Sequence, residues 1–120
     1  MANTDRLAMI EACNELIFQI EETAHENKEE FKVKIKELMI KALDFNKDIL
    51  GYGTKRYFIK AMNRWRQNGS LRRNIWLIPC LEDIKYACMP ISERPMIPGV
   101  DDLVNDLTYE QLLAEVNLLR

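Results

Sequence analysis

The strongest constraint on the fold is the spacing of apolar residues in the second quarter of the chain. They recur at alternating steps of four and three, at Phe31, Ile35, Leu38, Ala42, Phe45 and Ile49. This spacing is typical of a helix that buries one face, because it lines up a single apolar stripe along the helix. Asn27 followed by Glu30 has the form of a capping box. Together these features predict a helix over about 27–50.

An earlier stripe with the same period predicts a first helix over about 4–25, with Thr4 as its N-cap. Its expected buried positions are Leu7, Ile10, Cys13, Leu16, Ile17 and Ile20. Only a short polar turn separates the two helices. We therefore expect residues 1–50 to form a long antiparallel helical hairpin, with the two apolar stripes packed together.

The remainder of the chain also has helical punctuation. Gly51 and Gly53 are expected to end the second helix, and Thr54 to cap a third over 55–67. Shorter helical segments are expected at 71–77 and 79–89, the latter with Pro79 in its first turn. A Pro-rich loop over 90–99 follows, then C-terminal helices over 100–120, in which Asp101 caps a short turn and Thr108 and Gln111 form a second capping box.

These segments predict an all-α protein of five to six helices, in one compact domain over 1–120 built on the N-terminal hairpin. With 120 residues, the chain is long enough for one core without disulfides or metals. We see no internal repeat and no linker that would divide it.

Charge is distributed unevenly along this chain. Residues 49–81 contain no Asp or Glu, although the sequence has 19 of them, and the flanking segments 1–48 and 82–120 are net negative. Tyr, Phe and Trp side chains are interleaved with the cations of the 51–89 segment. The cations of the acid-free stretch are Lys55, Arg56, Lys60, Arg64, Arg66, Arg72 and Arg73.

A helical projection of 55–67 separates the rings from the charges. Phe58, Ala61, Met62 and Trp65 fall on one arc, expected to be buried. Arg56, Lys60 and Arg64 form an i, i+4, i+8 ridge on the opposite side, flanked by Lys55 and Arg66.

Three interpretations of this basic aromatic segment follow. The cations can pair with the chain's own acidic residues or face water, which is what most charged faces do. Arg, Trp and Tyr also dominate the binding energy of protein interfaces, so the surface can serve an acidic protein partner, a second copy of this chain included. Finally, a row of cations can contact nucleic-acid phosphates, with a turn after 67 compatible with a helix-turn-helix. We expect a non-catalytic interaction module, a small regulatory or adaptor protein; a nucleic-acid-binding protein is the alternative.

Other chemistry is weakly represented. The single histidine, His25, and the scattered Cys13, Cys80 and Cys88 have no metal-ligand spacing. Asp101, Asp102 and Asp106 suit helix capping better than cation binding. We therefore expect no catalytic residues, metal or cofactor. The odd cysteine count, the charged first turns and the absence of a long apolar run predict a cytoplasmic protein without a signal peptide or membrane span.

Overall fold

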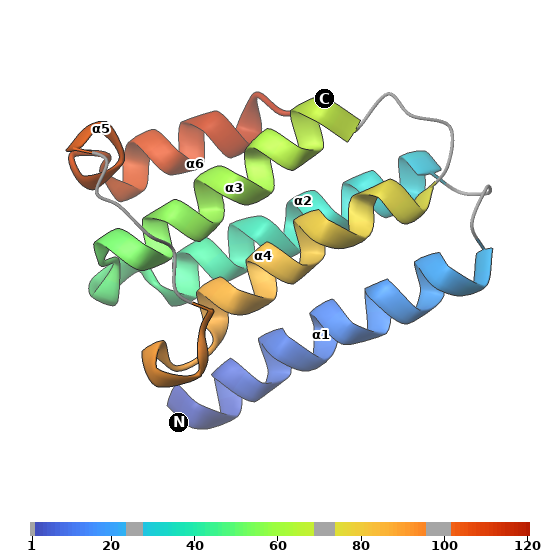
Figure 1. Ribbon diagram of the computed structural model, residues 1–120, viewed down its shortest axis with the longest axis horizontal. Helices are drawn as coiled ribbons and strands as arrows, with labels where there is room; N and C mark the ends of the chain where they lie inside the picture. Colours follow the sequence, from blue (N-terminus) through green and yellow to red (C-terminus); the bar gives the residue numbers. More distant parts are fainter. Residues whose placement is uncertain (1, 24–27, 69–73, 96–101) are drawn as a thin grey trace.

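Six α-helices follow one another in the computed structural model, which describes residues 2–23, 28–68, 74–95 and 102–120 (Figure 1). No strand occurs in these four segments, and three short 3-10 helices join some of the α-helices. In chain order, the elements are α1 (Ala2–Thr23), α2 (Lys28–Phe45), η1 (Lys47–Ile49), α3 (Tyr52–Asn68), η2 (Asn74–Leu77), α4 (Ile78–Cys88), η3 (Ile91–Glu93), α5 (Asp102–Asn105) and α6 (Tyr109–Asn117).

Helix α4 lies at the centre of the molecule. It packs between α1 and α3, with α2 behind it, and α3–α4 is the most extensive helix pair (Figure 1). Its side chains at Cys80, Leu81, Ile84, Ala87 and Cys88 are all buried. Pro79 lies in the first turn, as predicted, where its missing N–H has no helical partner to lose.

The predicted hairpin is not confirmed as the scaffold of the core. Helices α1 and α2 run in opposite directions and touch, but α1 packs mainly against α4 (Figure 1). Cys13, Leu16 and Ile20 are buried as predicted, whereas Leu7 is 58% exposed. The apolar stripe of α1 was therefore read correctly, but most of it contacts a helix far away in the sequence.

Helix α2 ends earlier than predicted because of Asn46. The Asn46 side chain donates to the carbonyl of Ala42 at 2.8 Å, and its backbone N–H also reaches back to Ala42 and Leu43. An Asn amide that binds the preceding turn competes with the helical backbone pattern, and the chain continues as η1. This change of direction turns Ile49 outward, where it is 58% exposed rather than buried.

Helix α3 begins earlier than predicted, so Gly53 and Thr54 lie inside it. The carbonyl of Gly51 accepts the first helical hydrogen bond, from the Lys55 N–H at 3.0 Å, which makes Gly51 the N-cap. Thr54 is buried and its hydroxyl accepts from Arg94 at 2.7 Å. Thr54 is thus not the N-cap, because the helix begins before it, and its hydroxyl binds a side chain from a distant segment instead.

The C-terminal region agrees with the sequence prediction. The Thr108 side chain accepts from the Gln111 N–H at 3.2 Å, and the Gln111 side chain accepts from the Thr108 N–H at 2.8 Å, which completes the capping box of α6. Leu112 and Val116 are buried. Asn27, His25 and Asp101 lie outside the described residues.

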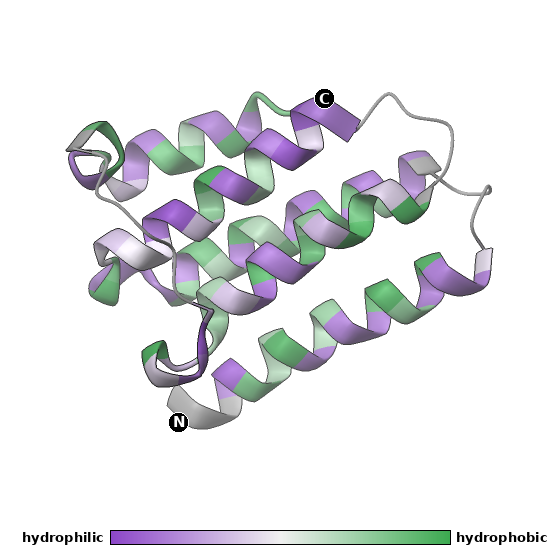
Figure 2. Cartoon of the chain, viewed as in Figure 1, coloured by the Kyte–Doolittle hydropathy of each residue, from purple (hydrophilic) through white to green (hydrophobic). Residues whose placement is uncertain are grey.

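The helices form one globule with extents of 37 × 30 × 25 Å and a radius of gyration of 13.7 Å. Each long helix mixes hydrophobic and hydrophilic residues along its length, as expected when one side is buried (Figure 2). The all-α compact domain is therefore confirmed. Within the described residues, no helix combines the length and apolar character that crossing a membrane requires.

The core assignment of α2 can be tested with two substitutions two residues apart. Ile35 is fully buried, whereas Val33 on the same helix is 58% exposed. Ile35→Asp places an unpaired charge in the core and should lower the free energy of unfolding by about 4 kcal/mol or more. Val33→Asp should change it by less than about 1 kcal/mol. Urea denaturation of both variants measures this difference; equal losses would contradict the packing described for α2.

Candidate interaction surface

Helix α3 separates its rings from its charges. Phe58, Ala61, Met62 and Trp65 are buried as the helical projection predicted, and Tyr57 joins them. The Trp65 indole N–H donates to the Arg120 carbonyl at 2.8 Å. The aromatic side chains of α3 are therefore mostly core residues, and what α3 can offer a partner is its cations.

Arg64 is not a free member of the predicted ridge. Its Nε donates to Oδ2 of Asp83 on α4 at 2.7 Å, and the Asp83 side chain is only 4% exposed. The Arg64 side chain is 41% exposed, so its role in partner binding stays a prediction, but a carboxylate of the same chain already accepts from its Nε. Arg64 is a structural residue that links α3 to α4.

Burial determines the electrostatics of Asp83. Desolvation raises the pKa of its carboxyl group above the ordinary 3.8, although the hydrogen bond and charge of Arg64, then the charge of Lys60, act in the opposite direction. A carboxylate in this position depends on its cationic neighbours, since an isolated buried charge is strongly unfavourable.

Two more of the predicted cations are held within the chain. The Lys55 ammonium donates to the Asn105 carbonyl at 2.8 Å, which ties α3 to α5. Arg66 pairs with Glu115 of α6, Nη2 to Oε2, at 2.7 Å. Both pairs lie at the surface, where such contacts contribute little to stability. Arg72 and Arg73 lie outside the described residues.

Arg56 and Lys60, one helical turn apart, retain the arrangement of the ridge. The Arg56 guanidinium lies 5.9 Å from the ring centroid of Tyr52, and the Lys60 ammonium 5.7 Å from that of Tyr57. Such cation–π contacts are weak where the side chains are partly exposed. Both side chains are half-buried, and their charges lie on the surface of the first half of α3.

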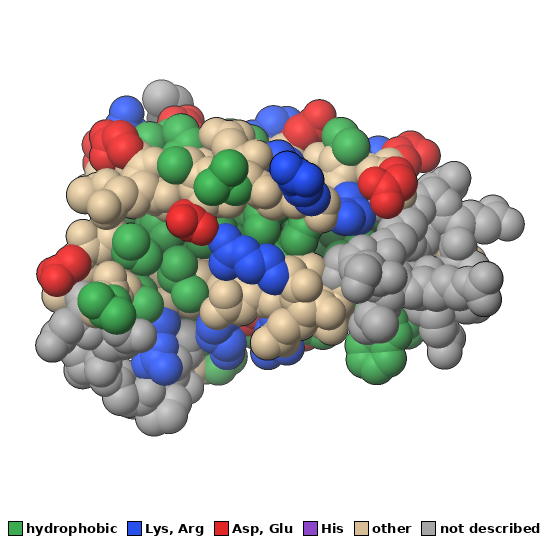
Figure 3. Space-filling model, turned by 90° about the horizontal axis from the view of Figure 1, so that it is seen from above, with side chains coloured by type: hydrophobic (Ala, Val, Ile, Leu, Met, Phe, Trp, Pro, Cys, Tyr) green, Lys and Arg blue, Asp and Glu red, His purple; other side chains and the backbone are tan. Residues whose placement is uncertain are grey.

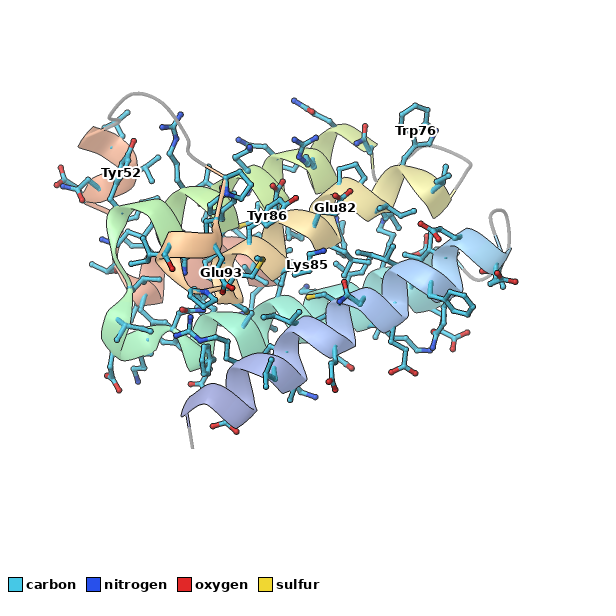
Figure 4. All side chains as sticks on the ribbon, turned by 60° about the horizontal axis from the view of Figure 1, so that its bottom comes forward. Tyr52, Trp76, Glu82, Lys85, Tyr86 and Glu93 are labelled. Carbon is cyan, nitrogen blue, oxygen red and sulfur yellow. The ribbon has the colours of Figure 1, made fainter. Side chains whose placement is uncertain are left out.

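The tertiary structure divides the aromatic residues of the segment. Tyr52 lies near α5 at one end of the molecule and Trp76 lies at the opposite end, with Glu82, Lys85 and Tyr86 of α4 between them (Figure 4). Tyr52 and Trp76 therefore cannot belong to one small binding site. The basic aromatic segment provides two separate surfaces rather than one.

A pocket of about 330 Å³ opens where the start of α3 meets residues 91–95. We call it the α3 pocket. Its walls include Ile49, Tyr52, Gly53, Arg56, Ile91 and Arg94. The Ile49 and Ile91 side chains are 58% and 81% exposed, so its rim is apolar. The volume is at the lower end of the roughly 300–1,000 Å³ of small-ligand sites.

Arg94 fixes the wall of the α3 pocket. Its guanidinium donates to the carbonyls of Ala87 and Met89, both at 2.9 Å, and to the Thr54 hydroxyl at 2.7 Å. The Tyr57 hydroxyl also donates to the Pro95 carbonyl. These bonds attach residues 91–95 to both α3 and the C-terminal end of α4, where a cation is favourable. Among the described residues, no carboxylate forms an ion pair with Arg94.

The face that carries α3, α5 and α6 is seen from above in Figure 3. Hydrophobic side chains gather in its left half, with side chains of both charge signs beside them (Figure 3). Apolar side chains bordered by charged ones are the arrangement found in protein interfaces, where apolar anchors contribute energy and charged rims contribute specificity.

The cysteines lie in the core. Burial raises the pKa of the Cys13 thiol to about 12 and that of Cys88 to about 11, and it also raises the pKa of Cys80. Protonated, buried thiols are poor nucleophiles. In the four described segments, no group of three or more His, Cys, Asp or Glu residues is arranged to hold a metal ion.

Comparison with known proteins gives no relative of this chain: no protein family, no curated protein and no solved structure matches it. The features that bear on its function are therefore those of its own structure, a small all-α domain with a cation-bordered pocket at one end.

Sequence reasoning missed Asp83 and Arg94. Asp83 falls within the apolar spacing of α4, between Cys80 and Ala87, and an acidic residue in such a stripe is a detectable signal of a buried ion pair. Arg94 gave no such signal, because its partners come from the backbone of α4 and from α3.

The structural role of Arg64 can be separated from that of its neighbour Lys60. Arg64→Met leaves Asp83 without its partner and should lower the free energy of unfolding by about 2–3 kcal/mol at neutral pH. Lys60→Met, one turn away, should lower it by about 0.5 kcal/mol or less.

The pH dependence of the Arg64→Met deficit gives an independent check. Without Arg64, the pKa of Asp83 in the folded protein should rise further above the unfolded value near 3.8. Below the unfolded pKa the Asp83 carboxyl is protonated in both states, so the stability deficit of the variant should be small. The deficit should grow as pH rises from the folded pKa of the wild type to the higher folded pKa of the variant. Denaturation at several pH values measures this; a deficit independent of pH would contradict the proposed role.

Proposed function

We propose that this protein is a non-catalytic interaction module, a small regulatory or adaptor domain that binds an acidic protein partner. The binding surface comprises the α3 pocket and the adjoining cations Arg56 and Lys60. The observation that carries the proposal is the position of an apolar-rimmed pocket directly beside cations in the part of the chain that contains no acidic residue.

The chemistry of this surface supports a protein partner. Exposed Ile49 and Ile91 offer apolar area that water solvates poorly, and Tyr52 and Arg56 belong to the residue types that carry binding energy in interfaces. The acidic residues elsewhere in the chain would repel a uniformly negative polymer. They would also orient a partner whose acidic patch faces α3.

Nucleic-acid binding is the second candidate. The row from Arg56 to Lys60 supports it, since cations one turn apart can contact successive phosphates. The internal contacts of Lys55, Arg64 and Arg66 count against it, because these three cations of the predicted row are engaged within the chain. If Arg56 and Lys60 neutralised about two phosphates, log K should fall with log salt at a slope of about −2.

Neutralisation of the two cations tests the proposal. Arg56→Gln with Lys60→Gln should weaken binding to acidic members of a short-peptide array by about three- to tenfold, the effect of two partly exposed charges. Fluorescence anisotropy with labelled peptides and with labelled duplex DNA and single-stranded RNA measures both candidates.

A matched control is Lys34→Gln with Lys41→Gln on α2, beside Glu15 and Glu37, which changes the net charge by the same amount. It should retain the wild-type affinity. Equal effects of the two double variants, or no binding of any acidic peptide, would refute the proposal. Salt-dependent binding of DNA or RNA alone would establish the second candidate. Light scattering of the purified protein separately tests whether a second copy is the partner.

A further inference from the structure

We propose that the α3 pocket is an anchor site for one large apolar side chain, of the size of Leu or Phe, carried by an acidic segment of the partner protein. This inference rests on the proposed function and identifies the chemistry of the partner. Three observations support it: the apolar rim, the unpaired cation in its wall, and the glycine that keeps it open.

The apolar rim of the α3 pocket favours an apolar side chain as its occupant. Ile91 is 81% exposed and Ile49 58% exposed, and both line the pocket, whose volume is about 330 Å³. An aliphatic or aromatic side chain bound there would remove both isoleucines and the face of Tyr52 from water. A single side chain that fills a pocket is the usual anchor of a peptide-binding interface.

The charge of Arg94 favours a carboxylate next to the anchor side chain. The guanidinium of Arg94 has five N–H donors. Its three hydrogen bonds go to neutral acceptors, the Thr54 hydroxyl and the carbonyls of Ala87 and Met89, and use one donor on each nitrogen. Among the described residues none of these partners is a carboxylate, and burial, followed by the charge of Arg6, lowers the pKa of Arg94. A carboxylate next to the anchor side chain could form a charge-assisted hydrogen bond with Arg94. Asp48 and Glu93 near the rim are exposed and would disfavour a more densely acidic partner.

Gly53 keeps the pocket open. It lies in the first turn of α3, its backbone is not in the left-handed region, and an added Cβ would meet no atom within 4 Å. Neither backbone conformation nor packing therefore requires glycine here, although glycine in a helix is about 0.5–1 kcal/mol less favourable than alanine. A molecule bound in the pocket would account for the glycine, since any side chain at this position would stand at the wall of the pocket.

The experiment compares pocket filling with charge removal. Fluorescence anisotropy measures binding of two short acidic peptides that differ only in a central Phe or Ala. The wild-type protein should bind the Phe peptide about tenfold more tightly or better, the effect of burying one large side chain. Gly53→Leu should fold at least as stably as the wild type, and should bind the two peptides equally and weakly.

Ile91→Ala provides a second variant that does not alter an α-helix. It should also reduce the preference for Phe, whereas Leu118→Ala, which removes a similarly exposed side chain at the end of α6, should not. The Arg56→Gln, Lys60→Gln variant should weaken both peptides by the same factor and retain the preference.

The outcomes separate the two proposals. If acidic peptides bind and the Arg56 and Lys60 substitutions weaken them, but the Phe and Ala peptides bind equally, the anchor site is wrong and the interaction module stands. If Gly53→Leu retains the full preference for Phe, the anchor lies elsewhere. If no acidic peptide binds, both proposals are refuted.

Discussion

Burial of α4 is the constraint on which the rest of the structure depends. This helix is apolar on more of its circumference than one neighbour can cover, so α1, α2 and α3 all pack against it. The same burial encloses Asp83, which carries a charge into the interface with α3. Arg64 compensates that charge, and the middle of α3 is consequently committed to structure.

The commitment of Arg64 decides where a partner can bind. Farther along α3, Arg66 pairs with α6, and Trp65 is held in the core by its bond to Arg120. The first half of the helix carries the partly exposed cations Arg56 and Lys60 beside the α3 pocket. The proposed binding surface therefore lies at one end of the bundle, where α3 begins.

The α3 pocket shows how a rigid frame can surround an open space. Arg94 satisfies the end of α4 and reaches the Thr54 hydroxyl, so residues 91–95 are attached to two helices. Gly53, by contrast, adds neither packing nor helix propensity. In the proposed anchor site, a wall fixed by several hydrogen bonds would be preorganised, which would lower the cost of binding.

The sequence by itself determined the helical class, the buried stripes of α2 and α3, the Pro79 start of α4 and the capping box of α6. These follow from spacing and local hydrogen bonds, which depend on residues a few positions apart. The sequence did not predict where α2 ends or where α3 begins. The Asn46 side chain competes with the helical backbone, and the Thr54 hydroxyl binds Arg94 rather than capping α3. Only the tertiary structure decided that α1 packs mainly on α4, that Arg64 is already paired, and that the start of α3 meets residues 91–95 to form a pocket. The reason is physical: each depends on groups distant in the sequence, and the period of an apolar stripe states that a face is buried without stating what buries it.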